Sequence, residues 1–75
     1  MFVVWVRSKQ RDDLKAFDGE DLAVAYATKA IEALETERAD VFSVDGAQAD
    51  APRAIKTVRD GKGELLLSRV PKLTE

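Results

Sequence analysis

The stretch DGEDLAVAYATKAIEALETER, residues 18–38, decides the fold because it is the longest segment with a helical pattern. At 100° per residue, its apolar side chains fall in one arc of roughly 200°, which predicts a buried face. That arc holds Leu22, Ala23, Val24, Tyr26, Ala27, Ala30, Ile31, Ala33 and Leu34. Most of the other positions, Glu32 and Glu35 among them, are polar, so we expect the opposite face of this helix to be exposed.

Acidic residues gather at the start of this predicted helix. Asp18 is a suitable N-cap, because its carboxylate can accept hydrogen bonds from the free amides of the first turn. Glu20 and Asp21 lie where the helix dipole favours negative charge. Three carboxylates so close together could also bind a cation, but the capping and dipole roles account for them. We therefore expect no bound metal.

Four other segments have the composition or the alternation of strands. Residues 2–6 form an unbroken run of β-formers, typical of an interior strand covered on both faces, and we expect Trp5 within it to be a core residue. Residues 14–17 follow a polar turn and predict a short hairpin partner, and residues 40–45 alternate. Residues 64–70 contain three consecutive leucines, which again indicates a central strand.

The segment 47–63 supports two interpretations. A helix over 51–60 is favoured by apolar spacing of i, i+3, i+4 and i+7, by Asp50 as a cap and by Gly61 as a left-handed stop. The dipeptide Asp60-Gly61 is also a strong hairpin turn, which would make residues 55–59 a strand paired with the next one. We favour the helix and keep the hairpin as the alternative.

Together these elements predict a single α+β domain over residues 1–75, with a frayed tail at 71–75. A small mixed sheet of three or four strands would pack on the long helix and on the short one, in the order β(β)αβαβ. The alternative order, with the C-terminal hairpin, is ββαβββ. A domain this short buries only about 60% of its unfolded surface, so we expect modest stability.

The chain has no cysteine and no histidine. This excludes disulfides, thiolate zinc sites and a cysteine nucleophile, and it removes the commonest metal ligand and general base. No serine has a histidine to activate it. We therefore expect no enzyme activity, no catalytic residues and no cofactor. The N-terminal apolar run is too short to span a membrane, and we expect a soluble cytoplasmic protein.

Charge is distributed unevenly along the chain, although the net charge is only −2. Residues 1–11 carry three bases, residues 12–50 carry eleven acids against three bases, and residues 51–75 carry six bases against three acids. The N-terminal bases are Arg7, Lys9 and Arg11. If the two ends of the chain meet in one sheet, the molecule has a basic side and an acidic side. Ordinary solvated charge is the simpler interpretation.

Two binding functions remain. The first is a regulatory module that binds a protein partner stoichiometrically, through an acidic surface at Glu32 and Glu35, a sheet edge, or a basic surface at Arg53, Lys56 and Arg59. The alternative is weak nucleic-acid binding by those three bases and Lys62, together with the N-terminal ones. The acidic pI of about 5.1 and the lack of a helix-turn-helix, RNP or KH motif count against it.

Short, cysteine-free α+β chains of this kind resemble in style the accessory proteins of phages and mobile elements, including anti-CRISPR inhibitors. The resemblance is one of size and composition. It implies an inhibitor that acts by binding its target.

Overall fold

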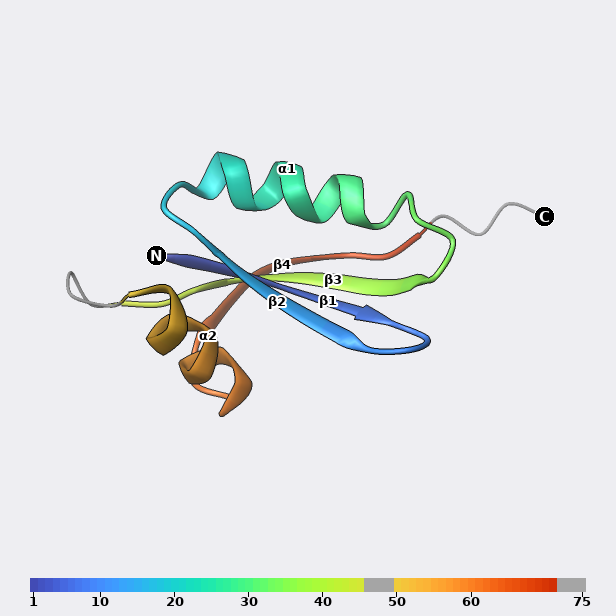
Figure 1. Cartoon of the computed structure of the whole chain (residues 1–75). Coiled ribbons are helices and arrows are strands. Elements are labelled where there is room, and N and C mark those ends of the chain that lie inside the picture. The colour runs from blue at the N-terminus through green and yellow to red at the C-terminus, as the bar shows by residue number, and fades with distance from the viewer. Residues whose placement is uncertain (46–49, 72–75) are drawn as a thin grey trace.

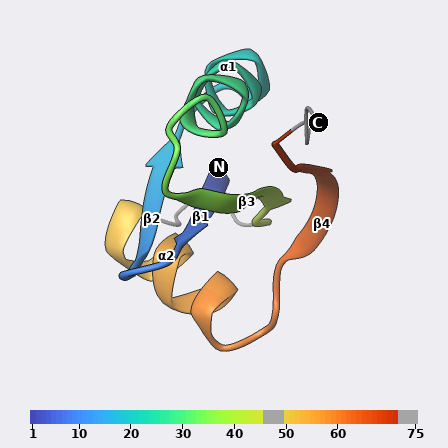
Figure 2. The ribbon, with the colours of Figure 1, turned by 90° about the vertical axis from the view of Figure 1, so that its right-hand side faces the viewer.

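The computed structural model describes residues 1–45 and 50–71 and has an α+β architecture (Figure 1). A four-stranded sheet carries one helix on each face (Figures 1 and 2). The elements are β1 (Phe2–Ser8), β2 (Asp12–Phe17), α1 (Glu20–Ala30), β3 (Thr36–Ser43), α2 (Ala51–Arg59) and β4 (Glu64–Arg69). The predicted class and the order ββαβαβ are confirmed, and the alternative with a C-terminal hairpin is wrong.

The strand order is β2-β1-β3-β4, and every neighbouring pair is antiparallel. The prediction of a mixed sheet is therefore wrong. β2 and β3 both run antiparallel to β1 and therefore parallel to each other. Two parallel strands need a crossover connection, and α1 is that connection. β1 lies between β2 and β3, which confirms that residues 2–6 form an interior strand.

Each face of the sheet has its own apolar core. The α1-side core is built of small buried side chains from the helix and from the central strands, and Tyr26 and Ile31 pack at its margin. Its buried members are Val4, Val6, Ala23, Ala27, Ala39 and Val41. The α2-side core lies on the other face, where Val3, Val44, Ala54 and Val58 are buried and Trp5 packs against them. Alternate residues of β1 therefore enter different cores.

Helix α1 is shorter than the predicted span of 18–38, because it ends at Ala30. Residues 31–35 form turns, and the chain then enters β3 at Thr36. Thr36 pairs with Ser8 and Arg38 pairs with Arg7, so the last three residues of the predicted helix complete the ladder with β1. Pairing with a central strand outweighs the weak helical preference of this segment.

Two leucines assigned to the buried face of α1 are exposed, Leu22 by 61% and Leu34 by 99%. Leu34 lies beyond the end of the helix, in the turn before β3. Leu22 lies at the edge of the contacting stripe, because that stripe is centred on Ala23 and Ala27. Ala23 and Ala27 are fully buried, so α1 contacts the sheet through small side chains at the centre of the stripe.

The ends of the two helices differ in their capping. Gly19 is the N-cap of α1 and no side chain caps it, so the predicted capping role of Asp18 is wrong. In α2 the prediction is confirmed, since the amide of Arg53 donates to the Asp50 carboxylate at 3.0 Å. Gly61 has φ of 84° and ends α2 in the left-handed conformation, as predicted.

β4 is an edge strand, not the central strand that its three leucines predict. It pairs with β3 on one side, and α1 and α2 pack mainly on β1, β2 and β3. The C-terminal tail predicted at 71–75 lies, apart from Pro71, outside the described residues.

The full burial of the alanines at the centre of α1 predicts that overpacking is costly there. We expect Ala27→Leu to lower the free energy of unfolding by about 1–3 kcal/mol, because Ala27 is fully buried and additional methyl groups have no space. Ala25→Leu is the control on the exposed side of the same helix and should change it by less than about 0.5 kcal/mol. Urea denaturation measures both, and equal losses would contradict the assigned stripe.

The capping difference predicts unequal effects of two aspartate substitutions. Asp50→Ala removes an acceptor from the first turn of α2 and should cost about 1 kcal/mol of stability. Asp18→Ala removes no cap and should have little effect on the melting temperature. A larger loss from Asp18→Ala than from Asp50→Ala in calorimetry would reverse this assignment.

Candidate functional site

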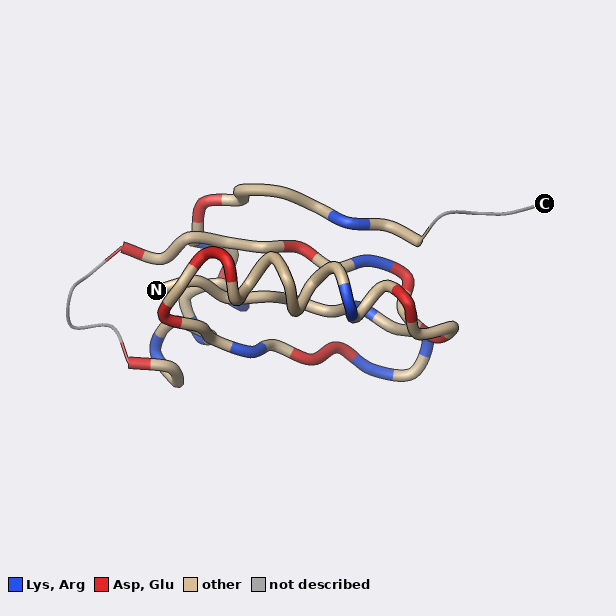
Figure 3. The backbone as a smooth tube through the Cα atoms, turned by 90° about the horizontal axis from the view of Figure 1, so that it is seen from above, with Lys and Arg blue, Asp and Glu red and all other residues tan. Residues whose placement is uncertain are grey.

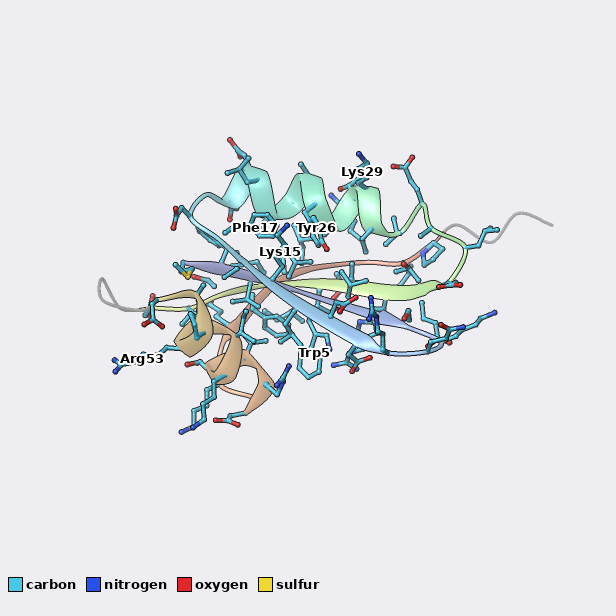
Figure 4. The ribbon with its side chains drawn as sticks, in the orientation of Figure 1. Trp5, Lys15, Phe17, Tyr26, Lys29 and Arg53 are labelled. Atoms are coloured by element: carbon cyan, nitrogen blue, oxygen red, sulfur yellow. The ribbon has the colours of Figure 1, made fainter. Side chains whose placement is uncertain are left out.

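Helix α2 presents three bases on one exposed face. Arg53, Lys56 and Arg59 follow one another at intervals of three residues, and all three are exposed. At 100° per residue they span about 120° of the helix surface, opposite the arc that carries buried Ala54 and Val58. Arg53 points away from the sheet (Figure 4). We call these three side chains the basic face of α2.

The basic face of α2 is not neutralised within the part of the chain that the structure describes. The ion pairs of residues 1–45 and 50–71 are Arg11–Asp13 and Arg38–Asp40, and neither involves α2. The carboxylate of Asp50 is used as the N-cap. The three bases are therefore available to an anionic partner.

Glu32 and Glu35 lie apart from the basic face, in the turns that follow α1. Both are exposed, and the carbonyl of Glu35 accepts a hydrogen bond from the amide of Lys9 at 3.1 Å. This contact places the acidic turn beside the β1–β2 hairpin, at the end of the sheet away from α2 (Figure 1). The five predicted site residues therefore form two surfaces, not one.

Charge is separated between the two helical layers. The segment 18–35, which contains α1, has five acids against one base, and the segment 50–62, which contains α2, has four bases against two acids. The net charges are −4 and +2. Acidic positions flank the α1 helix in the view from its side of the sheet (Figure 3). Because α1 and α2 cover opposite faces, this separation runs across the sheet and not from one chain end to the other.

The N-terminal bases do not extend the basic face of α2. Lys9 and Arg11 lie at the tip of the β1–β2 hairpin, at the opposite end of the sheet from α2 (Figure 1). Arg7 lies in β1, where its guanidinium carbon is 4.5 Å from the centre of the Trp5 ring. Lys9 and Arg11 therefore do not join Arg53, Lys56 and Arg59 in one basic patch.

A polar cluster that the sequence did not indicate lies on the α2 side of the sheet. The Nε atom of Arg38 donates to the Asp40 carboxylate at 2.7 Å, and its Nη2 donates to Ser68 Oγ at 3.3 Å. Asp40 is only 2% exposed. Its position opposite Trp5 follows from the β1–β3 register. The one signal in the sequence was a charged residue within the apolar run of 39–42.

Trp5 lies beneath the sheet beside α2 (Figure 4) and is partly buried. Its ring packs against Phe42, with centroids 6.4 Å apart. The Arg7 guanidinium lies over the same ring, a favourable cation–π geometry. Trp5 therefore lies at the margin of the α2-side core, where its Nε1 and the Nε of Arg7 are buried without a hydrogen-bond partner among the described residues.

No group of three or more potential metal-ligating side chains assembles within the described ranges 1–45 and 50–71. Asp18, Glu20 and Asp21, which are adjacent in the sequence, do not converge on a common point there. In the same ranges, no helix is both long enough and apolar enough to cross a membrane.

Two Arg–Asp pairs of equal sequence separation allow a matched test of burial. We expect Arg38→Ala to cost about 2 kcal/mol, because it leaves the buried carboxylate of Asp40 without its charged donor. Arg11→Ala breaks a pair at 3.6 Å whose side chains are 79% and 58% exposed, and should cost less than about 0.5 kcal/mol. Denaturant titration compares the two, and equal costs would show that burial of Asp40 is unimportant.

Comparison with known proteins found no matching family model, no matching curated protein and no matching solved structure.

Proposed function

We propose that this protein is a small regulatory module that binds an acidic surface of another protein through the basic face of α2, with fixed stoichiometry and without turnover. The observation that supports it is the exposure of Arg53, Lys56 and Arg59 on one side of a helix whose other side is buried. An inhibitor of the kind found among phage accessory proteins would work in this way. The proposed compartment is the cytoplasm.

The charge separation across the sheet supports an oriented encounter with an acidic partner. Such a partner is attracted to the layer that contains α2 and repelled by the layer that contains α1, since their net charges are +2 and −4. Attraction of this kind raises the association rate and is weakened by salt. The same asymmetry selects which face of the molecule meets the partner.

Binding without catalysis suits the residues that the chain offers. With no histidine and no cysteine, the usual general base and the most reactive nucleophile are absent from the whole sequence. A specific interface of about 800 Å² per partner needs only an exposed surface. Helix α2 supplies part of such a surface, because its exposed side is fixed in place by a capped N-terminus and by packing of Ala54 and Val58.

Nucleic acid is the alternative ligand of the same bases. The basic face of α2 extends over only about 9 Å of helix, from Arg53 to Arg59, and the hairpin bases lie elsewhere. So few phosphate contacts give weak, non-specific and strongly salt-dependent binding. An acidic protein surface, which adds apolar and hydrogen-bonding contacts, is therefore the better match.

Two double charge reversals test which surface is used. The immobilised full chain should capture its partner from nuclease-treated lysate of the native host, and Arg53→Glu with Lys56→Glu should lose that partner. Glu32→Lys with Glu35→Lys changes the charge by the same amount on the acidic turn and should retain it. With the purified partner, calorimetry should give a fixed ratio, and association should slow as salt is raised while dissociation changes less.

Circular dichroism of both variants provides the folding control, since all four side chains are exposed. Capture that survives the α2 reversal but is lost with the acidic reversal would move the contact to the turn after α1. Capture that survives both reversals would show that neither charged surface is needed for binding. Submicromolar, sequence-selective binding of duplex DNA or RNA at physiological salt would favour the alternative ligand.

A further inference from the structure

The two edges of the sheet differ in how they are protected. β2 has the sequence DDLKAF, and charged side chains at an edge oppose pairing with another strand. β4 has the sequence ELLLSR, with charge at its two ends only. In Figure 3 the β2 edge carries several charged positions, whereas the β4 edge is uncharged between one acidic and one basic position. Between Glu64 and Arg69, β4 has no charged side chain that opposes pairing, and its one protective feature is the break in its register with β3.

The apolar part of β4 is exposed in the single chain. Leu65 is 50% exposed and Leu66 is 38% exposed, while Leu67 packs at the margin of the α1-side core. The helices pack mainly on the other three strands, and β4 stands at the outer edge of the sheet (Figure 2). Within residues 1–45 and 50–71 no strand pairs with the outer side of β4, and two exposed leucines accompany this edge.

We infer that β4 pairs with β4 of a second copy of this chain, antiparallel about a two-fold axis between Leu66 and Leu67. In this register Glu64 of each copy lies opposite Arg69 of the other, and Leu65 lies opposite Ser68. The two-fold axis makes each of these contacts twice. The charges at the ends of β4 are thus complementary to those of a second β4.

A break in the register between β3 and β4 allows Glu64 of one copy and Arg69 of the other to meet on the same face of the sheet. Glu64 and Arg69 are five residues apart and would lie on opposite faces of a regular strand. However, Glu64 pairs with Ser43 and Arg69 pairs with Ala39, and these partners are four residues apart on β3. The register shift leaves Leu66 without a partner on β3, so Glu64 and Arg69 lie on the same face. Oppositely charged cross-strand pairs need this arrangement.

The resulting dimer has one continuous sheet, made from two four-stranded sheets joined at β4. It leaves the basic face of α2 exposed on both copies, so it is separate from the proposed partner surface. A contact of six residues per copy is small, below about 1,200 Å² in total, and such interfaces dissociate readily. We expect self-association in the micromolar range.

Sedimentation equilibrium of the full chain over a concentration series tests the pairing. The wild type should pass from monomer to dimer as concentration rises, and Leu66→Lys should remain monomeric because it places a charge at the centre of the edge. Glu64→Arg and Arg69→Glu should each weaken the dimer by about tenfold, since each creates two like-charged pairs. The double variant with both reversals should restore it.

The matched control is Asp13→Arg, which changes the charge of the β2 edge by the same amount as Glu64→Arg and should leave the dimer unchanged. Amide exchange should slow with concentration in β4 and not in β2, and circular dichroism confirms that each variant is folded. A wild type that stays monomeric at all concentrations would overturn the inference, as would a dimer that tolerates Leu66→Lys. Failure of the folded double variant to restore the dimer would overturn the register.

Discussion

Burial of β1 on both faces is the constraint on which the other elements depend. Val3 and Val4 are neighbours in the strand, point to opposite faces, and are both fully buried. Each face of the sheet therefore needs its own cover, and within the described residues one helix packs on each face. Among the described residues, the α1-side core has six buried side chains and the α2-side core has four, so both cores are thin.

The features of the fold that could be predicted from sequence are those set by local chemistry. The apolar run of residues 2–6 predicted a doubly covered strand, and Asp50 and Gly61 predicted the start and the end of α2. The end of α1 could not be predicted, because residues 36–38 leave the helix only to pair with β1. Leu34 followed the helical period and was misassigned for the same reason.

The candidate site also has features that could be predicted from the sequence and features that could not. The spacing of Arg53, Lys56 and Arg59 predicted a basic helix face, because periodicity alone places them together. The Arg38–Asp40 pair and its contact with Ser68 depend on which strands are neighbours and on their register. Sequence patterns carry little information on strand order. The only indication of this cluster in the sequence was one aspartate, Asp40, within the apolar run 39–42.

The three leucines of β4 conflict with the edge position of that strand, and this conflict has a physical explanation. A run of large apolar side chains is typical of a strand with neighbours on both sides, yet among the described residues β4 pairs on one side only. A small domain with two thin cores gains most from burying surface outside itself. The apolar edge at β4 and the basic face of α2 would then serve different contacts, one joining two copies by backbone pairing and the other meeting a partner by charge. Because they occupy different elements, each can be altered without removing the other.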